Sequence, residues 1–325
     1  MRVCIIGNFS DRLLDEGLKN VAHHLADNIA AIPSMQVLRV NNAEVHLKTL
    51  SAIKEFRPEI VHYVPGPTNL SVFFLKFVQL YLGSTPKIVL SAIHPLVNDI
   101  VFKATRFKPY CVFSPSISFK QRMERIGVRS ELLLNGVDAN KFAPVSESEK
   151  KRLRIKYGLR TDEFTILHVG HLIYNRSLHH LLSLPGSNQI VVVASEYIDV
   201  KEELLASLNA GGCTVFRGYF PHIEEFYQLA DCYFFPVKNQ KTLVCPLSIM
   251  EAMASNLPVV TAELESIAAF FGNVPGLLVA REDVDFAHHV EAVRNGEVAV
   301  KTRQGIQRYS WEHVAQQIAK VYLES

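Results

Sequence analysis

Short apolar runs, each long enough for one buried strand, recur along the whole chain. In the first half they are Arg2–Gly7, Val37–Val40, Ile60–Val64, Lys87–Ile93, Cys111–Ser114 and Ser130–Leu134. In the second half they are Phe164–Val169, Gln189–Ala194, Thr214–Arg217, Cys232–Pro236, Pro258–Thr261 and Gly276–Val279. Stretches with apolar residues at helical spacing separate them, for example Leu18, Val21, Ala22, Leu25 and Ile29. This alternation predicts parallel, doubly wound sheets of the α/β class.

One charged segment, Val145–Arg160, interrupts the alternation and has no strand character. We interpret it as a linker between two Rossmann-like domains, which the length of 325 residues also favours. The predicted domains cover residues 1–145 and 161–309. Open α/β sheets bind ligands beyond the carboxyl ends of their strands, so two facing sheets would enclose a ligand between them.

Composition indicates a globular protein, with 48% hydrophobic and 20% charged residues. The five cysteines form no CxxC pair and no cluster with zinc spacing, as is typical of buried thiols in a cytosolic protein. The apolar run at the N-terminus is too short for a secretory signal, and no apolar span is long enough to cross a membrane. We therefore expect a cytoplasmic protein.

Charge is unevenly distributed. Residues 1–144 contain 17 Lys and Arg against 11 Asp and Glu, a net charge of +6, whereas residues 145–325 contain 17 against 21, a net charge of −4. The basic half indicates either an anionic partner, such as phosphate or a lipid surface, or an ordinary solvated surface. No basic stripe with interleaved aromatic residues occurs, so we expect no nucleic-acid partner. The apolar segment 69–83 is interpreted as a helix packed on a sheet rather than a membrane-dipping element.

The stretch Pro246–Val260 reads PLSIMEAMASNLPVV and carries a single carboxylate, Glu251. At helical spacing Glu251 shares a face with Ser248 near the start of a helix, where free N–H groups and the helix dipole favour an anion. A structural alternative is a capping box, in which the Glu251 carboxylate accepts the backbone N–H of Ser248. The spacing by itself leaves both interpretations open.

Five segments of the chain share an order and spacing with a known family: LLLNGVDANKFAP (132–144), VGHLIYNRSLHHLL (169–182), FRGYFPHIEEFYQLADCYFFP (216–236), PLSIMEAMASNLPVV (246–260) and YSWEHVAQQIAKVYL (309–323). Together they resemble the nucleotide-sugar-dependent glycosyltransferases of the GT-B fold, specifically the retaining family 4 type (glycosyltransferase group 1). The resemblance implies an α/β GT-B fold in which two Rossmann-like domains face each other across a cleft. It also implies an acceptor-side N-terminal domain, a nucleotide-sugar-binding C-terminal domain, and a terminal helix, 310–325, that crosses back to the first.

The implied activity is transfer of a sugar from a nucleotide diphosphate sugar to an acceptor hydroxyl, with retention and without a metal or other cofactor. Arg176 would stabilise the departing diphosphate, Glu251 would bind the ribose hydroxyls, and His94 would contact the donor sugar near the reaction centre. Further donor-binding positions implied by the resemblance are Gly17, Gly170, His171, Tyr219, Leu247 and Ser248.

Two positions depart from the family pattern. His171 stands where the family has an arginine, and Leu243 stands where its E-x7-E motif has the first glutamate. These departures leave two alternatives open: a catalytically degenerate nucleotide-sugar-binding protein and a sugar-nucleotide epimerase. The acceptor also stays open as a lipid carrier, a glycan or a small molecule, and the basic half favours a peripheral membrane contact.

Other polar patterns are interpreted as structural. Adjacent histidines on a helix point about 100° apart, so the pairs His23–His24 and His179–His180 are poor metal sites. Asp283-Val-Asp285 superficially resembles the DxD motif of metal-dependent transferases but precedes a helical stretch, where capping acids are common. No GxGxxG follows the first strand, so the fingerprint of a nicotinamide dehydrogenase is missing.

Overall fold

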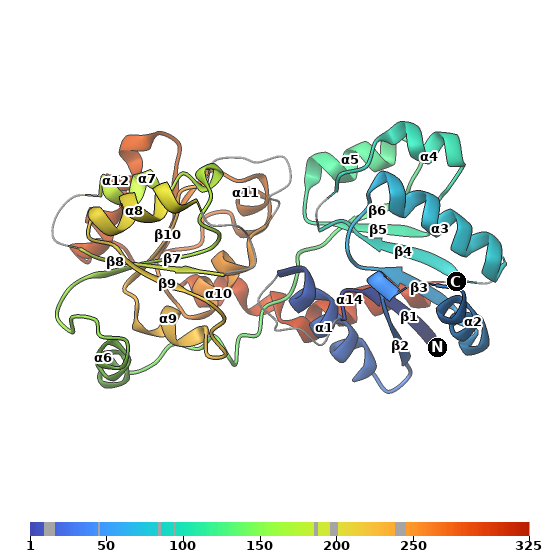
Figure 1. The fold of residues 1–325 in the computed structure, drawn as a ribbon, viewed down its shortest axis with the longest axis horizontal. Coiled ribbons are helices and arrows are strands. Elements are labelled where there is room, and N and C mark those ends of the chain that lie inside the picture. The colour runs from blue at the N-terminus through green and yellow to red at the C-terminus, as the bar shows by residue number, and fades with distance from the viewer. Residues whose placement is uncertain are drawn as a thin grey trace. The chain divides into compact units, whose positions relative to one another are not determined.

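A computed structural model describes residues 1–9, 17–44, 46–83, 86–93, 95–184, 188–195, 201–237 and 245–324. The chain divides into two compact units (Figure 1). Unit 1 contains Met1–Gly136 and Trp311–Ser325, and unit 2 contains Val137–Gln240 and Cys245–Ser310. The C-terminal helix α14 (Trp311–Leu323) is therefore part of unit 1, although it follows the residues of unit 2 in the sequence.

Unit 1 is built on a parallel sheet with strand order β2-β1-β3-β4-β5-β6 in the part of the chain that the structure describes. Its strands are β1 (Arg2–Gly7), β2 (Gln36–Asn41), β3 (Ile60–Tyr63), β4 (Lys87–Ser91), β5 (Cys111–Ser114) and β6 (Ser130–Leu132). The central strands are apolar at consecutive positions because helices cover both faces of the sheet.

The helices of unit 1 divide between the two faces of this sheet. Those of the first group are α2 (Leu47–Phe56), α3 (Asn69–Leu82), α4 (Asp99–Thr105) and α5 (Ile117–Arg125), and their apolar side chains form one cluster with Val112 of β5. The neighbouring residue Phe113 lines a small cavity with side chains of α1 (Gly17–Ala30) and α14. Since successive strand residues point to opposite faces, α1 and α14 cover the second face.

Unit 2 repeats this architecture with strand order β12-β11-β10-β7-β8-β9, all pairs parallel. Its strands are β7 (Thr165–Val169), β8 (Gln189–Ala194), β9 (Thr214–Arg217), β10 (Cys232–Phe235), β11 (Val259–Ala262) and β12 (Leu277–Ala280). Its helices are α6 (Glu147–Lys156), α7 (His179–Leu182), α8 (Glu202–Ala210), α9 (Glu224–Leu229), α10 (Leu247–Ala254), α11 (Glu265–Phe271), α12 (Asp283–Arg294) and α13 (Thr302–Ile306).

The predicted α/β class with two Rossmann-like units is confirmed. Each apolar run expected to form a strand corresponds to one of β1 to β12, and no bound differs by more than two residues. The strands could be read from the sequence because parallel strands covered on both faces must be apolar throughout.

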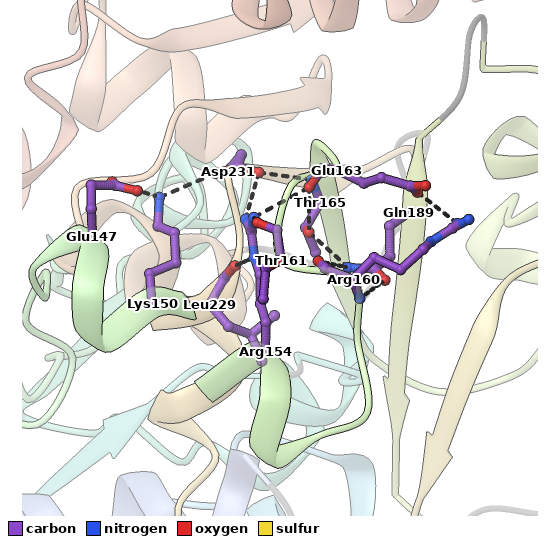
Figure 2. A network of polar contacts seen from close by, with 10 residues as sticks. All are labelled: Glu147, Lys150, Arg154, Arg160, Thr161, Glu163, Thr165, Gln189, Leu229 and Asp231. Atoms are coloured by element: carbon purple, nitrogen blue, oxygen red, sulfur yellow. Dashed lines mark hydrogen bonds and ion pairs between the residues drawn. The ribbon is translucent and has the colours of Figure 1, made fainter. Parts of the chain in front are cut away.

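The segment predicted as a linker, Val145–Arg160, instead forms α6 and belongs to unit 2. Its Arg154 is buried, and the guanidinium donates from Nε to the Leu229 carbonyl (2.9 Å) and from Nη1 to the Thr161 carbonyl (2.9 Å). Its Nη2 forms an ion pair with Asp231 at 2.6 Å (Figure 2). The prediction was wrong because a charged segment with no strand pattern can still be anchored by one buried, fully paired arginine.

Candidate functional site

The direction of strand addition reverses in unit 2 between β7 and β10. From β7 the chain adds β8 and β9 on one side, then returns to place β10, β11 and β12 on the other. Ligands of open α/β sheets bind beyond the carboxyl ends of the strands at such a switch point. Side chains from the end of β7, the segment after it, β10 and α10 lie there, and they include several residues singled out from the sequence.

Arg176 lies in the short 3-10 helix Tyr174–Arg176 that follows β7. Its guanidinium carbon is 5.8 Å from the centre of the Phe235 ring at the end of β10. Burial lowers its pKa, and its buried Nε has no hydrogen-bond partner. No carboxylate pairs with it among the described residues. A largely buried cation without a counter-ion is costly, so this arrangement is suited to an anionic ligand.

His168, on β7, is fully buried beside Arg176. Its Nδ1 is 2.9 Å from the Phe234 carbonyl oxygen, to which it donates, so Nε2 is left as an acceptor. This Nε2 is buried and has no partner in the described structure. Burial lowers the pKa of His168 to about 4, and the nearby charge of Arg176 acts in the same direction. His168 is therefore a neutral acceptor next to a cation.

Gly170 allows this close arrangement. A Cβ atom at position 170 would lie 3.0 Å from Nε2 of His168, closer than side-chain carbons normally approach. The neighbouring charge of His171 also lowers the pKa of His168, which places His171 in the same group.

Tyr233, on β10, connects three elements of the site. Its hydroxyl donates to the Val169 carbonyl at the end of β7 (3.3 Å) and is hydrogen-bonded to the Ser248 side chain of α10. Its ring stacks on Tyr227 with 5.7 Å between the ring centres. Burial raises its pKa, so the hydroxyl stays protonated and able to donate. This network fixes the first turn of α10 relative to the end of β7.

Glu251 lies one turn inside α10 and is partly buried. Its Oε2 accepts a hydrogen bond from the Tyr227 hydroxyl at 2.7 Å, whereas Oε1 has no hydrogen-bond partner among the described residues. Burial raises the pKa of Glu251, and the Tyr227 hydrogen bond and the charge of Lys141 oppose this shift. The capping-box interpretation is wrong, because the N-cap residue is Pro246 and Ser248 lies inside the helix.

The structure thus gathers most of the predicted donor-binding residues of unit 2. Gly170, His171 and Arg176 follow β7, while Leu247, Ser248 and Glu251 lie on α10. Tyr219 lies beyond the end of β9 and is 38% exposed, and no described contact joins it to this group. Gly17 begins α1 in unit 1. His94 and Leu243 lie outside the described residues.

Sequence reasoning missed three residues of this group: His168, Tyr227 and Tyr233. Each has a polar atom inside an apolar stretch, namely FTILHV for His168 and FYQLADCYFF for the two tyrosines. A polar group that interrupts a buried strand or helix was the available signal.

The remaining polar patterns have structural roles. Asp285 accepts the backbone N–H groups of Arg281 (2.8 Å) and Glu282 (2.9 Å) at the start of α12, so the capping interpretation is confirmed. No group of three or more His, Cys, Asp and Glu residues suited to a metal ion occurs among the described residues. None of the described helices has both the length and the apolar character needed to cross a bilayer.

Comparison with known proteins finds similarity to glycosyltransferases. Residues 163–295 match the family model Glycosyl transferases group 1. The putative glycosyltransferase EpsD of Bacillus subtilis is 25% identical over 150 residues, which are 43% of this chain and 39% of that protein. The uncharacterized glycosyltransferase MJ1607 of Methanocaldococcus jannaschii is 26% identical over 210 residues, 59% of this chain and 53% of that protein. The chain thus matches about half or less of the length of these relatives.

Solved structures resemble nearly the whole chain. Sucrose-phosphate synthase from Thermosynechococcus elongatus superposes with a TM-score of 0.74 at 16% identity, covering 99% of this chain and 98% of that one. HepE of Anabaena, in complex with UDP-glucose, gives a TM-score of 0.72 at 14% identity, covering 98% of each chain. At such identities the likeness establishes the fold, and the GT-B prediction is confirmed. The predicted resemblance to group 1 glycosyltransferases is confirmed by the family match in unit 2.

Proposed function

We propose that this chain, which carries a group 1 glycosyltransferase domain at residues 163–295, moves a sugar from a nucleotide diphosphate sugar to an acceptor hydroxyl. The observation that supports this most directly is the largely buried guanidinium of Arg176, unpaired among the described residues, at the switch point of unit 2. A diphosphate offers anionic oxygens that a guanidinium binds with two parallel hydrogen bonds. The complex of HepE with UDP-glucose supports a donor of this class.

Arg176 and α10 would share the stabilisation of the leaving group. As the bond to the sugar breaks, negative charge grows on the diphosphate, and Arg176 would stabilise it without reorganisation. The backbone N–H groups of Leu247 and Ser248 lie in the first turn of α10, where the helix dipole adds positive potential. The hydrogen bond between Ser248 and Tyr233 holds this turn in position.

Glu251 would bind the ribose of the donor. Tyr227 occupies Oε2 and fixes the carboxylate, which leaves Oε1 to accept a ribose hydroxyl. Only the ionised carboxylate accepts hydrogen bonds on both oxygens, so ribose binding requires Glu251 to be charged. His168 would accept a further ligand hydroxyl through Nε2, since it is neutral and its other nitrogen is occupied.

Retention and independence of a metal ion are further parts of the proposal. Arg176 and the N-terminus of α10 would supply the positive charge that a divalent ion supplies in other transferases. Roles for Gly17 at the phosphates, for His94 at the sugar and for Tyr219 at the base complete the proposal. The acceptor is a hydroxyl of a lipid carrier, a glycan or a small molecule.

The first experiment is a panel of nucleoside diphosphates and their sugars, read by thermal shift. A stabilising nucleotide then identifies the donor for an assay of nucleoside diphosphate release, with and without candidate acceptors and with EDTA. We expect one base to be preferred, release to depend on the matching sugar, and EDTA to have no effect.

Other outcomes distinguish the alternatives. Tight donor binding without any release would indicate a binding protein that has lost turnover. Conversion of the donor to an isomer in the absence of an acceptor would indicate an epimerase. Activity that is lost with EDTA and restored by magnesium would contradict the metal-independent mechanism.

A further inference from the structure

Helix α3 of unit 1 is apolar on two opposite faces. One face contributes Val72, Leu75 and Val78 to the core, and all three are completely buried. The other face carries an apolar stripe that is exposed to solvent: Leu70 (82% exposed), Phe73 (54%), Phe77 (50%) and Leu80 (70%). These positions recur every three or four residues, so they form one line along the helix. The expectation that segment 69–83 packs on a sheet is therefore correct for only one of its faces.

The exposed stripe continues onto the segment that leads into α4 and onto the first turn of that helix. Leu96 and Ile100 are 61% and 68% exposed. The backbone N–H of Leu96 donates to the Pro67 carbonyl (3.0 Å), and that of Asn98 donates to the side chain of Asn69 (2.9 Å). These bonds hold the segment against the beginning of α3, and the two helices are neighbours in Figure 1.

Single exposed apolar residues are ordinary, but a line of leucine and phenylalanine side chains is not. We call the six residues Leu70, Phe73, Phe77, Leu80, Leu96 and Ile100 the apolar face. The core does not need them, because the opposite side of α3 already covers the sheet. Their exposure therefore indicates a partner.

The chain around the apolar face is strongly basic. Residues 60–123 contain seven Lys and Arg residues and one acidic residue, Asp99, a net charge of +6. Asp99 is paired with Arg122 at 2.9 Å and Lys120 with Glu124, so these two cations and their acidic partners largely compensate each other. Three exposed cations, Lys103, Arg106 and Lys108, follow Ile100 directly in the sequence.

We propose that the apolar face binds the surface of an anionic phospholipid bilayer. The leucine and phenylalanine side chains of α3 enter the boundary between head groups and acyl chains, with the helix lying in the plane of the membrane. Lys103, Arg106 and Lys108 contact phosphate groups, each with a favourable interaction that falls off within a Debye length. The 14 residues of α3 are too few to span a bilayer, so the contact is peripheral. A second copy of the chain is a poorer partner, because it would bring the same basic border against this one.

The test is sedimentation of the whole protein with lipid vesicles. One set contains phosphatidylcholine alone, and in the other about a third of the lipid is phosphatidylglycerol, which supplies the anionic surface. We expect binding to the anionic vesicles only, weakening as salt is added. The double variant Phe73→Ser/Phe77→Ser should lower vesicle affinity at least about tenfold, because two inserted rings are lost. Lys103→Glu/Lys108→Glu should lower it as well and reduce the dependence on salt.

A matched control uses apolar residues of unit 2 with similar exposure. Ile155 and Val284 are 69% and 67% exposed, and Ile155→Ser/Val284→Ser should leave vesicle affinity unchanged. All these positions are on the surface, so far-UV circular dichroism should show unaltered melting. Vesicle binding that is absent, or that survives Phe73→Ser/Phe77→Ser, would overturn the proposal. So would a dimer in solution that the same double variant dissociates, since the apolar face would then join two copies.

Discussion

Unit 2 contains two arginines removed from bulk water, and their surroundings are opposite. Arg154 has its guanidinium bonded to three backbone carbonyls and to the carboxylate of Asp231 (Figure 2). Arg176 has an aromatic neighbour, Phe235, and no counter-ion in the described part of the chain. A buried charge with all its hydrogen bonds made is part of the fold. One that lacks them among the described residues is suited to bind an anionic ligand.

Two buried strand histidines show the same contrast. In unit 1 the Nε2 of His62 is 2.8 Å from the Ser91 hydroxyl and its Nδ1 is bonded to the Tyr322 hydroxyl, so both nitrogens are occupied. In unit 2 only the Nδ1 of His168 is occupied. His62 therefore connects α14 to the sheet, whereas His168 keeps an acceptor nitrogen beside Arg176 that is unpaired among the described residues.

The largest effect is expected from Arg154→Leu. It would leave three backbone carbonyls without their donor and Asp231 with Lys150 (3.1 Å) as its remaining cation among the described residues. Removal of one side of a buried pair typically costs about 3–5 kcal/mol of unfolding free energy. Urea unfolding followed by circular dichroism measures the loss, while nucleotide affinity of the folded protein should be unchanged. Adding Asp231→Asn should recover part of the stability. A loss below about 1 kcal/mol would place Arg154 among ordinary surface cations.

Arg176→Ala should lower the transfer rate without lowering stability, in contrast to Arg154→Leu. We expect the transfer rate to fall about 10²-fold or more, as for removal of a preorganised charge stabiliser. Thermal stability should be unchanged or slightly higher, because a cation that lacks a partner is removed. The matched control is Arg160→Ala, since Arg160 is an arginine of unit 2 whose side chain is 69% exposed. An unaltered kcat/KM for Arg176→Ala would remove Arg176 from the mechanism.

The histidines provide a third test. His62→Leu leaves the Ser91 and Tyr322 hydroxyls unpaired in the core and should cost about 2 kcal/mol of stability. His168→Leu removes one hydrogen bond to a carbonyl and should cost about half as much, but it should weaken donor binding severalfold. Chemical denaturation and calorimetric titration with the nucleotide measure the two effects. Equal loss of stability with unchanged donor affinity would show that His168, too, is only structural.

Glu251→Gln should weaken nucleotide binding about tenfold, the scale of one charge-assisted hydrogen bond. The variant keeps an oxygen for Tyr227 and avoids the cost of burying a charge. Because burial raises the pKa of Glu251 above its ordinary 4.5, the folded state is penalised as pH rises through that raised pKa. The variant should therefore be more stable than the wild type at neutral pH, with the difference vanishing below about pH 4.

The same titration predicts the pH dependence of donor binding. Affinity of the wild type should fall as Glu251 is protonated, at a pH higher than for an exposed glutamate, while the glutamine variant should not show this step. Donor affinity that is the same for both proteins across this range would contradict the ribose assignment.

The sequence by itself determined the strands, the division into two α/β halves and the positions of Arg176 and Glu251. Buried parallel strands need consecutive apolar residues, and the loop after β7 and the helix α10 are continuous segments with their own residue order. These patterns depend only on residues that are close together in the sequence. They can therefore be recognised without knowing which distant segments pack against them.

Only the tertiary structure decided which polar groups are satisfied and which apolar face is covered. Asp231 is 77 residues from Arg154, Phe234 is 66 residues from His168, and Tyr227 reaches Glu251 from another helix. The charged segment of Arg154 was interpreted as a linker, and segment 69–83 as a helix simply packed on a sheet, because a sequence gives the type of each side chain but not its neighbour. Hydrogen bonding and burial depend on that neighbour, and packing of distant segments supplies it.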